Sequence, residues 1–593
     1  MSPKGGIRKR VLANVEEKPA DTPASSSSGL RGGVRQRARA RQEDAGGETV
    51  DLNGPLLQKW KRDWAKGILS SPQVQDYAAG AIAQGASGLG KVAAAGSHGR
   101  HPQNLQRSLV ALFGTPEGAP PFSWFTIPTK SGDVSHPFLL PHDWLQSLYR
   151  SKPELWSSAV QGPDGAVTEF WQNMDDTPIA RDHPCLDRNR TIPLGLHGDG
   201  GSFSKQDSLY VFTVNSLLGE GESACKRFVM TIIKKSELVP GTLDKMMDIM
   251  GWSFNIALTG LTPVVSYEGE DIDNPTYLAG MWKGSLVQIR GDWEFYCSIF
   301  RFPQWNTAEH MCWLCKAAGQ GDLAFGNCGS DAPWRGTMQT HESWTADLEA
   351  KGKQLPALMH RVAGLRLESV MVDILHTVDL GIAAHIIGNI FWACVQQGVW
   401  AGGTQAERVA GLQAAVANHY KATRETSRLR GDIEVQHLRT AAGWPKLKGK
   451  AAPIRHLARF ALDLARAHLG VRERAVCQLL VQFYEVIGSE SMFLSDDAKR
   501  LVPGIGLRLG VLYAQLSREA RIAGVKAWKV TPKLHLFQHL CEHQSVLFGN
   551  PRFYWTYADE DMVGHLVEVG ATCHPRTLAC TALYKWLLFC FAK

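Results

Sequence analysis

Short apolar runs separated by turns mark the segment from residue 191 to residue 302. Four of these runs are rich in β-branched and aromatic residues, which favours strands: IPLGLHG, DSLYVFTVNSLL, KRFVMTIIKK and KGSLVQIRG. Between the third and the fourth run, apolar residues recur at helical spacing in TLDKMMDIMGWSFNIALTG. The pattern therefore predicts an α/β unit in the order of three strands, a helix and a fourth strand.

Helical patterns dominate the chain after about residue 366. Three long segments have the apolar periodicity of amphipathic or buried helices: LESVMVDILHTVDLGIAAHIIGNIFWACV, IRHLARFALDLARAHL and RAVCQLLVQFYEVIG. The most apolar stretch contains His385, Asn389 and two glutamines, so we expect a buried helix rather than a membrane span. A late helix, PKLHLFQHLCEH, precedes the segment TYADEDMVGHLVEVG, which is also helical in pattern.

The chain of 593 residues is too long for one compact core, so several domains are expected. Residues 1–50 are low in large apolar residues and rich in Arg, Gly, Ser and Ala, which predicts a disordered basic tail. Residues 51–190 are predicted to form an N-terminal domain that is first helical and then rich in Pro and Trp. The units expected after it are the first part of the α/β core (191–302), a Cys- and Trp-rich segment (303–365), a mainly helical insertion (366–545) and a C-terminal helix that completes the core (546–593).

The positive charge is concentrated at the N-terminus. The chain carries a formal net charge of +7, and residues 1–42 hold ten Lys and Arg against three acidic residues. The remainder is therefore formally neutral, and the basic character belongs to the tail. The runs IRKR and RGGVRQRARARQ suit a nuclear import signal or a phosphate-binding arm, with a solvated tail without function as the alternative.

The twelve cysteines lack the dense spacing of a disulfide framework, which predicts a reducing compartment. Cys312 and Cys315 have the C-x-x-C spacing that suits tetrahedral zinc, although two ligands do not make a site. Cys328 and His341 are the nearest residues that would complete it, and His310 is another candidate. Buried thiols in a Trp-rich loop are the alternative.

Three histidines recur at four-residue intervals in the late helix. His535, His539 and His543 therefore share one helix face. This spacing is compatible with metal binding, but we favour packing or a phosphate contact for these side chains.

Two aspartates stand at the ends of predicted strands. Asp199 follows IPLGLHG in a Gly-rich turn, and Asp292 follows KGSLVQIRG where a helix begins. Taken singly, the first is typical of a turn residue and the second of a helix N-cap. The predicted strand order is the ribonuclease H-like one, in which the first and fourth strands are neighbours. In that fold both carboxylates reach adjacent strand ends, where a pair can hold hard divalent cations.

A third acid is expected from the late segment TYADEDMVGHLVEVG. It offers Asp559, Glu560 and Asp561 at the start of a helix. Acidic residues are also favourable at a helix N-terminus without any catalytic role. If one of the three is catalytic, we favour Glu560.

The order of these motifs resembles that of the DDE transposases of the CACTA and Plavaka type. The motifs are HGDGG, then GDWEFYCSIFRFPQWN before the C-x-x-C, then VDILHTVDLG and the late ADED. The resemblance implies a ribonuclease H-like core interrupted by a large Cys-containing and mainly helical insertion. It places Asp199, Asp292 and Glu560 in a carboxylate triad, with Asp373 and His376 as an accompanying pair.

The resemblance covers roughly residues 190–570 and implies a transposon-derived protein that cleaves and transfers DNA strands. Three carboxylates would hold two Mg²⁺ or Mn²⁺ ions about 4 Å apart, and zinc would be structural. The implied partners are transposon DNA ends and further copies of the chain, without a membrane, in the nucleus. A catalytically silent, domesticated or decaying copy that binds nucleic acid or protein is the alternative. A nuclease acting on RNA or hybrids is a third hypothesis.

Overall fold

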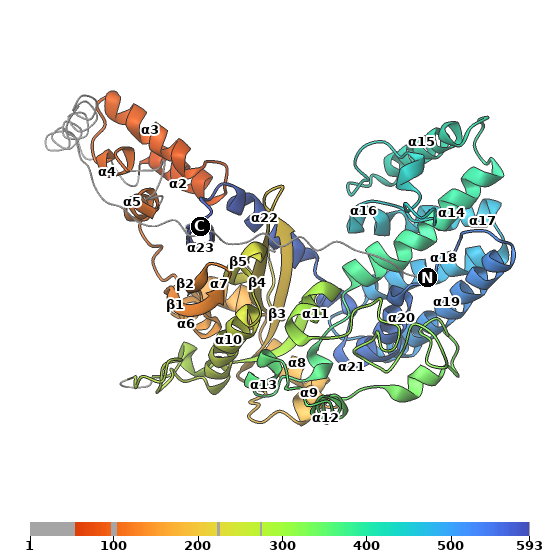
Figure 1. The fold of residues 1–593 in the computed structure, drawn as a ribbon, viewed down its shortest axis with the longest axis horizontal. Helices are drawn as coiled ribbons and strands as arrows, with labels where there is room; N and C mark the ends of the chain where they lie inside the picture. Colours follow the sequence, from red (N-terminus) through yellow and green to blue (C-terminus); the bar gives the residue numbers. More distant parts are fainter. Residues whose placement is uncertain (1–53, 96–102, 222–225, 273–275, 592–593) are drawn as a thin grey trace, which may run out of the picture.

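The computed structural model describes residues 54–95, 103–221, 226–272 and 276–591. The tail expected at residues 1–50 lies outside these residues. In Figure 1 a small sheet occupies the middle of the molecule. The N-terminal helices lie on one side of it, and the helices labelled α14 to α20 lie on the other.

The central sheet has four strands in the spatial order β5-β4-β3-β6. β3 (Thr191–Ser202), β4 (Ser208–Ser216) and β5 (Phe228–Lys234) form an antiparallel meander. β6 (Lys283–Gly291) pairs in parallel with β3, after the crossover helix α10 (Thr242–Thr259). The α/β class and the predicted order of three strands, a helix and a fourth strand are confirmed.

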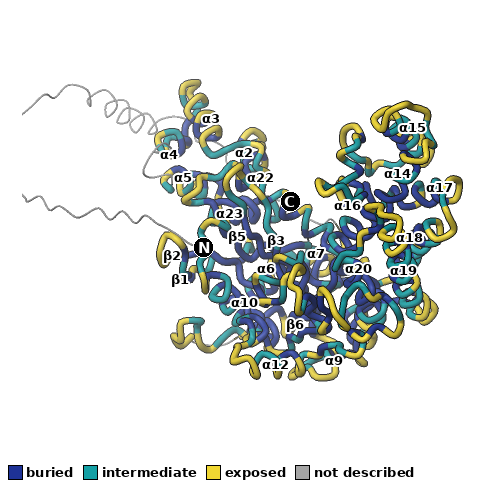
Figure 2. Tube along the Cα trace, turned by 45° about the vertical axis from the view of Figure 1, so that its right-hand side comes forward, coloured by how far each residue is buried: buried dark blue, intermediate teal, exposed yellow. Residues whose placement is uncertain are grey.

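The strands are buried along nearly their whole length. Residues 191–198 of β3 and all of β6 except its first residue are buried, which is typical of a sheet covered on both faces. Figure 2 shows this buried interior continuing into the helices around the sheet. Apolar residues therefore follow one another along these strands, instead of alternating with polar residues, because both faces of the sheet are covered.

The first four helices of the described residues form a small core of their own. In this core Trp64 and Leu109 pack with Tyr584 and Leu588 of the C-terminal helix α23 (Leu578–Phe591), so the two ends of the described chain lie together. The four helices are α2 (Pro55–Ala65), α3 (Ser71–Ala83), α4 (Gly90–Ala93) and α5 (Gln103–Phe113).

An antiparallel hairpin of β1 (Ser123–Thr129) and β2 (Gly132–Phe138) follows these helices. Its Phe125 and Phe138 belong to the main hydrophobic core. The helices between the hairpin and the central sheet are α6 (Pro141–Ser151), α7 (Pro153–Trp156), α8 (Ala166–Met174) and α9 (Pro178–Arg181).

A long run of helices separates β6 from the last part of the core. A π-helical turn (Leu375–Ala383) opens into α14, and together they form one stretch apolar enough to cross a membrane by length and composition, 83% of whose tested window is buried in the protein. The helices from β6 to the end of the run are α11 (Trp293–Phe300), α12 (His341–Ala350), α13 (Ala357–Arg361), α14 (Ala384–Gln397), α15 (Gln405–Thr423), α16 (Ala451–His456), α17 (Ala458–His468), α18 (Val471–Ser489), α19 (Asp496–Ile522), α20 (Pro532–His539) and α21 (Ser545–Phe548). α22 (Tyr557–Ala571) then returns to the sheet, against β3 and β4.

Candidate functional site

The two aspartates predicted at strand ends stand on neighbouring strands at the same level. β3 and β6 pair in parallel with Gly198 opposite Gly291, and an aspartate follows each of these glycines. Asp292 lies just past the end of β6, as predicted, but the turn predicted at Asp199 is wrong. Asp199 lies inside β3 and is paired with Val211, because β4 continues the ladder beyond the apolar run. Adjacent strands lie about 4.8 Å apart, which is close enough for both side chains to reach one cation. Asp292 also caps α11, because its Oδ1 accepts a hydrogen bond of 2.7 Å from the backbone N–H of Phe295.

The glycines around the aspartates permit this close packing. A Cβ at either Gly198 or Gly291 would overlap the ring of Phe295, which lies in the first turn of α11. On the opposite face of β3, a Cβ at Gly201 would come within 2.5 Å of Val567 in α22. The Gly-rich motif therefore allows α11 and α22 to approach the two faces of the strand that carries Asp199.

The three consecutive acids of α22 occupy three different environments. Asp559 is completely buried and forms ion pairs with Arg227 at 2.6 Å and Arg290 at 3.3 Å. Asp561 is exposed to solvent. Glu560 is half-buried and faces Asp199 and His376. Of the three acids, Glu560 is the one that faces Asp199 and has no arginine partner among the described residues, which favours it over its two neighbours.

Burial and the charge of Asp199 raise the pKa values of the two acids that lie beside it. Burial, the negative charge of Asp199 and a hydrogen bond to Asp199 raise the pKa of Glu560 to about 8, although His376 opposes this shift. Burial and the charge of Asp199 also raise the pKa of Asp292, against the hydrogen bond from Phe295. Such crowding of acids is the arrangement that a bound cation relieves.

Asp373 and His376 form a hydrogen-bonded pair beside these acids. The Nδ1 atom of His376 lies 2.9 Å from Oδ2 of Asp373, and its Nε2 lies 3.7 Å from Oε1 of Glu560. Burial lowers the pKa of His376, but the hydrogen bond and charge of Asp373 outweigh it and raise the pKa to about 9. The imidazole is therefore protonated at neutral pH and directs one N–H toward the carboxylates.

Both oxygens of Asp373 already accept hydrogen bonds within the protein. Its Oδ2 also accepts from the backbone N–H of His376, and its Oδ1 accepts from the backbone N–H of Thr556 at 2.9 Å. Thr556 immediately precedes α22, the helix that carries Glu560. Asp373 thus positions both His376 and the start of α22, and it acts on the site through them.

A second constellation is a buried group of two cysteines and two histidines. Cys312, Cys315, His535 and His539 place one donor atom each within 4.8 Å of all the others. Two thiolates and two imidazoles are a usual ligand set for tetrahedral zinc. This group could hold a metal ion such as zinc, and it joins the Cys-rich loop to α20.

The ligand set differs from the one expected from the sequence. Cys312 and Cys315 belong to the group, but Cys328 and His341 do not. The thiol of Cys328 faces the carbonyl of Gly326 at 3.7 Å, and Nδ1 of His341 accepts from the backbone N–H of Leu367 at 3.1 Å. The i, i+4 spacing of the late histidines was the available signal for the true partners.

The environment favours the metal-binding forms of His535 and Cys312, whereas burial and the neighbouring Cys312 raise the pKa of Cys315. Burial and the neighbouring His539 lower the pKa of His535, which keeps its imidazole neutral. Burial opposes ionisation of Cys312, but a hydrogen bond with Cys315 and the two histidines lower its pKa well below the ordinary value. Trp334 packs against both imidazoles, with ring centroids 4.4 Å and 5.2 Å away, and excludes water. Neutral imidazoles and thiolates are the forms that bind zinc.

Zinc content tests this metal centre. We expect the purified protein to contain about one zinc per chain by elemental mass spectrometry, because four ligands complete a tetrahedral site. Cys315→Ser and His539→Ala should lose the metal, whereas His539→Cys should keep it by supplying another thiolate. Cys328→Ser and His341→Gln are the matched controls, and loss of zinc in them would contradict the assignment.

Replacing Asp559 tests its structural role. Asp559→Asn leaves Arg227 and Arg290 buried without a negative partner, so it should lower the free energy of unfolding by about 3–5 kcal/mol. The shift in urea midpoint of the intrinsic fluorescence measures the effect. Asp561→Asn, at the exposed neighbouring position, should unfold like the unmodified protein, and equal midpoints for both variants would refute the buried pairing.

The pH dependence of stability tests the crowding of Glu560. Its pKa of about 8 lies above the ordinary 4.5, so the folded state holds this proton more tightly than the unfolded chain. Stability should therefore fall as pH rises from about 4.5 to about 8, and remain low above it. In metal-free buffer, Glu560→Gln should melt at a higher temperature than the unmodified protein at pH 9 and at the same temperature near pH 4.5. Melting curves of Glu568→Gln, an exposed change on the same helix, should follow the unmodified protein at every pH.

The site was also compared with known proteins. A scan of the chain against protein-family models gives no match, and no curated protein matches it. The function of the site is therefore inferred from its own geometry and from the order of its motifs.

Proposed function

We propose that this chain is a transposon-derived enzyme with a ribonuclease H-like core, which cleaves and transfers DNA strands with two divalent cations. The observation that carries the proposal is the convergence of Asp199, Asp292 and Glu560 from β3, the start of α11 and α22. The sheet order supports it, since β6 lies beside β3 as the ribonuclease H-like arrangement requires. The resemblance of the motif order to CACTA and Plavaka transposases supports the reaction type.

The donor set fits hard cations. Asp199, Asp292 and Glu560 offer only oxygen ligands, which Mg²⁺ and Mn²⁺ prefer, and all three are partly accessible. The raised pKa values of Asp292 and Glu560 indicate an excess of negative charge that cations would neutralise. When bound, two such ions supply activation of the attacking hydroxyl and stabilisation of the leaving oxygen.

His376 would act on the phosphate from beside the carboxylates. Asp373 binds its Nδ1 side, so the Nε2–H remains directed at the site. A protonated imidazole there can donate a hydrogen bond to a non-bridging phosphate oxygen as negative charge develops. Asp373 keeps the imidazole charged and oriented, which makes it a positioning residue in this scheme.

The proposed partners follow from the reaction. Transposon ends would be the DNA substrate, and assembly of further copies would bring two ends together. The basic tail at residues 1–42 would serve nuclear import or hold DNA phosphates by charge.

Strand cleavage tests the triad. Asp199→Asn, Asp292→Asn and Glu560→Gln should each reduce Mg²⁺-dependent nicking about a thousandfold or more, because each removes a charged ligand of the cations. The asparagine at residue 292 keeps the cap of α11, so the fold is preserved. The assay follows conversion of supercoiled plasmid carrying the flanks of this gene to open circles, with Asp561→Asn as the control.

The alternatives give different results in the same assay. Nicking that is unchanged in the three variants would remove the carboxylates from the reaction. Failure of the unmodified protein to cut in Mg²⁺ or Mn²⁺ would favour a catalytically silent binding protein. Preferential cutting of RNA–DNA hybrids without end specificity would favour a nuclease.

A further inference from the structure

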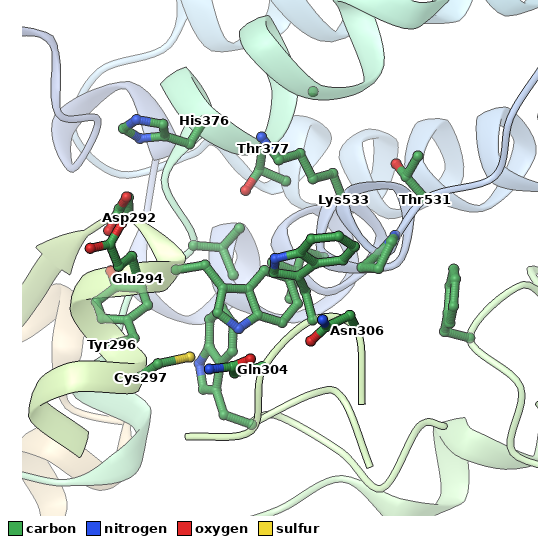
Figure 3. A pocket seen from close by; sticks show the side chains of 18 of the residues that line it. Asp292, Glu294, Tyr296, Cys297, Gln304, Asn306, His376, Thr377, Thr531 and Lys533 are labelled. Carbon is green, nitrogen blue, oxygen red and sulfur yellow. The ribbon is translucent and has the colours of Figure 1, made fainter. Parts of the chain in front are cut away.

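A large cavity opens beside the carboxylate site. Its volume is about 1110 Å³, and Asp292, Asp373 and His376 line one part of its wall. The remaining wall comes from distant parts of the chain, including the loop after α11 and the segment that leads into α20. Figure 3 shows Asp292 and Glu294 on one side, and Thr377, Lys533 and Thr531 together on another. Of the proposed triad, Asp292 lines this cavity, and most of the wall comes from other residues.

Three lysines converge on the cavity. Lys446, Lys529 and Lys533 all line it, and none of them has a carboxylate partner within 4.0 Å among the described residues. Their charges act together on His385. Burial and the three lysines lower the pKa of this histidine to about 4. Burial and Lys446 likewise lower the pKa of Lys533 to about 8, and Asp373 and Asp292 oppose this shift. Cations that repel one another and have no carboxylate partner are suited to an anionic ligand.

The backbone is shaped to admit Lys533. Gly381 interrupts the π-helical turn with φ −97° and ψ −105°. A Cβ at Gly381 would lie 2.9 Å from Cδ of Lys533. The absence of a side chain therefore lets the stem of Lys533 run along the same turn that carries His376.

An exposed indole faces the same space. Trp305 lines the cavity with 59% of its surface accessible, although large aromatic side chains are usually covered. Gln304 and Asn306 flank it, and Figure 3 shows these two amides across the cavity from Thr377 and Lys533. By contrast, Trp313 is buried and held by Trp293 with ring centroids 5.1 Å apart. Trp305 is thus the indole available for stacking.

We propose that this cavity binds a stretch of unpaired DNA, with Lys446, Lys529 and Lys533 on its phosphates and Trp305 stacked on a base. A basic groove combined with an aromatic platform is how proteins bind single strands. The proposal rests on the proposed function, because it places the strand beside the carboxylates that would cut it.

The size of the cavity suits a few nucleotides of one strand better than a duplex. Pockets for small ligands measure about 300–1,000 Å³, so this cavity has room for a few nucleotides. Within a duplex, neighbouring bases cover both faces of every base except those at its ends, so Trp305 is best suited to stack on a base that has left its own helix. We therefore expect the DNA end to open before it reaches Asp292 and His376.

Binding in metal-free buffer tests the proposal separately from cleavage. The probe is a fluorescein-labelled twelve-nucleotide oligothymidylate, measured by anisotropy with excess unlabelled duplex to occupy the basic tail. The triple variant Lys446→Met/Lys529→Met/Lys533→Met keeps the apolar stems but removes the charges. We expect the triple variant to bind the oligonucleotide about tenfold more weakly or worse. The slope of log K against log salt should also become smaller by about 2, because each lost phosphate contact to a single strand lowers it by about 0.7.

The control and the indole variant sharpen the result. The matched control is Lys351→Met/Lys353→Met/Lys421→Met, which removes three exposed lysines elsewhere and should leave affinity and slope unchanged. Trp305→Ala should weaken binding about tenfold without changing the salt slope, because stacking involves no phosphate. The triple variant with Arg at the three cavity positions should restore binding, and melting temperatures establish that each variant is folded.

Two outcomes would overturn the proposal. One is equal affinity and slope for the cavity and control variants. The other is binding of a duplex as tightly as of the single strand by the unmodified protein. If strand binding behaves as expected but plasmid nicking is absent, the proposed reaction fails and the binding site remains. If nicking occurs and the cavity variants bind normally, only the cavity proposal fails.

Discussion

The arrangement of the site depends on one buried carboxylate. Asp559 lies between Arg227, just before β5, and Arg290 in β6, and Arg290 also bonds to Asn215 of β4. Charges taken out of water must be paired, so this contact fixes where α22 meets the sheet and how it is rotated. The next residue of a helix points about 100° further round. Glu560 is therefore turned from the arginines toward Asp199.

The start of α22 is held from the helical side as well. Asp373 binds the backbone of Thr556, and Asp379 accepts hydrogen bonds from Tyr557 and from Tyr484 of α18. Both aspartates belong to the segment around the π-helical turn. The long run of helices is thus bonded directly to the helix that carries the third acid, and a rearrangement among these helices would move Glu560 relative to the strand ends.

Features set by local pattern could be predicted from the sequence. The strand order and the place of Asp292 follow from apolar runs and the glycine next to it in the chain. Features set by distant partners could not be predicted. Asp559 is distinguished from Glu560 by its ion pairs with Arg227 and Arg290, which lie 332 and 269 residues earlier in the chain. An arginine inside the apolar run KGSLVQIRG was the one hint of a buried acid. The hairpin β1–β2 was obscured because Pro128 and Pro137 weaken a strand pattern, although a two-stranded edge tolerates them.

The Cys–His group also has a topological meaning. Cys315 and His535 are 220 residues apart in sequence, so a metal held there would tie a very long loop at its base. The entropic cost of closing a loop rises only with the logarithm of its length, by about 0.6 kcal/mol per doubling. Parts of the loop that do not contact α22 could consequently grow or shrink by whole turns while the two ends of the loop stay fixed, whereas the segments that carry Asp373, Asp379 and Tyr484 are held to the start of α22. A metal-bound Cys–His group at the base of the loop would let the chain acquire new segments there during evolution without disturbing the spacing of the carboxylates.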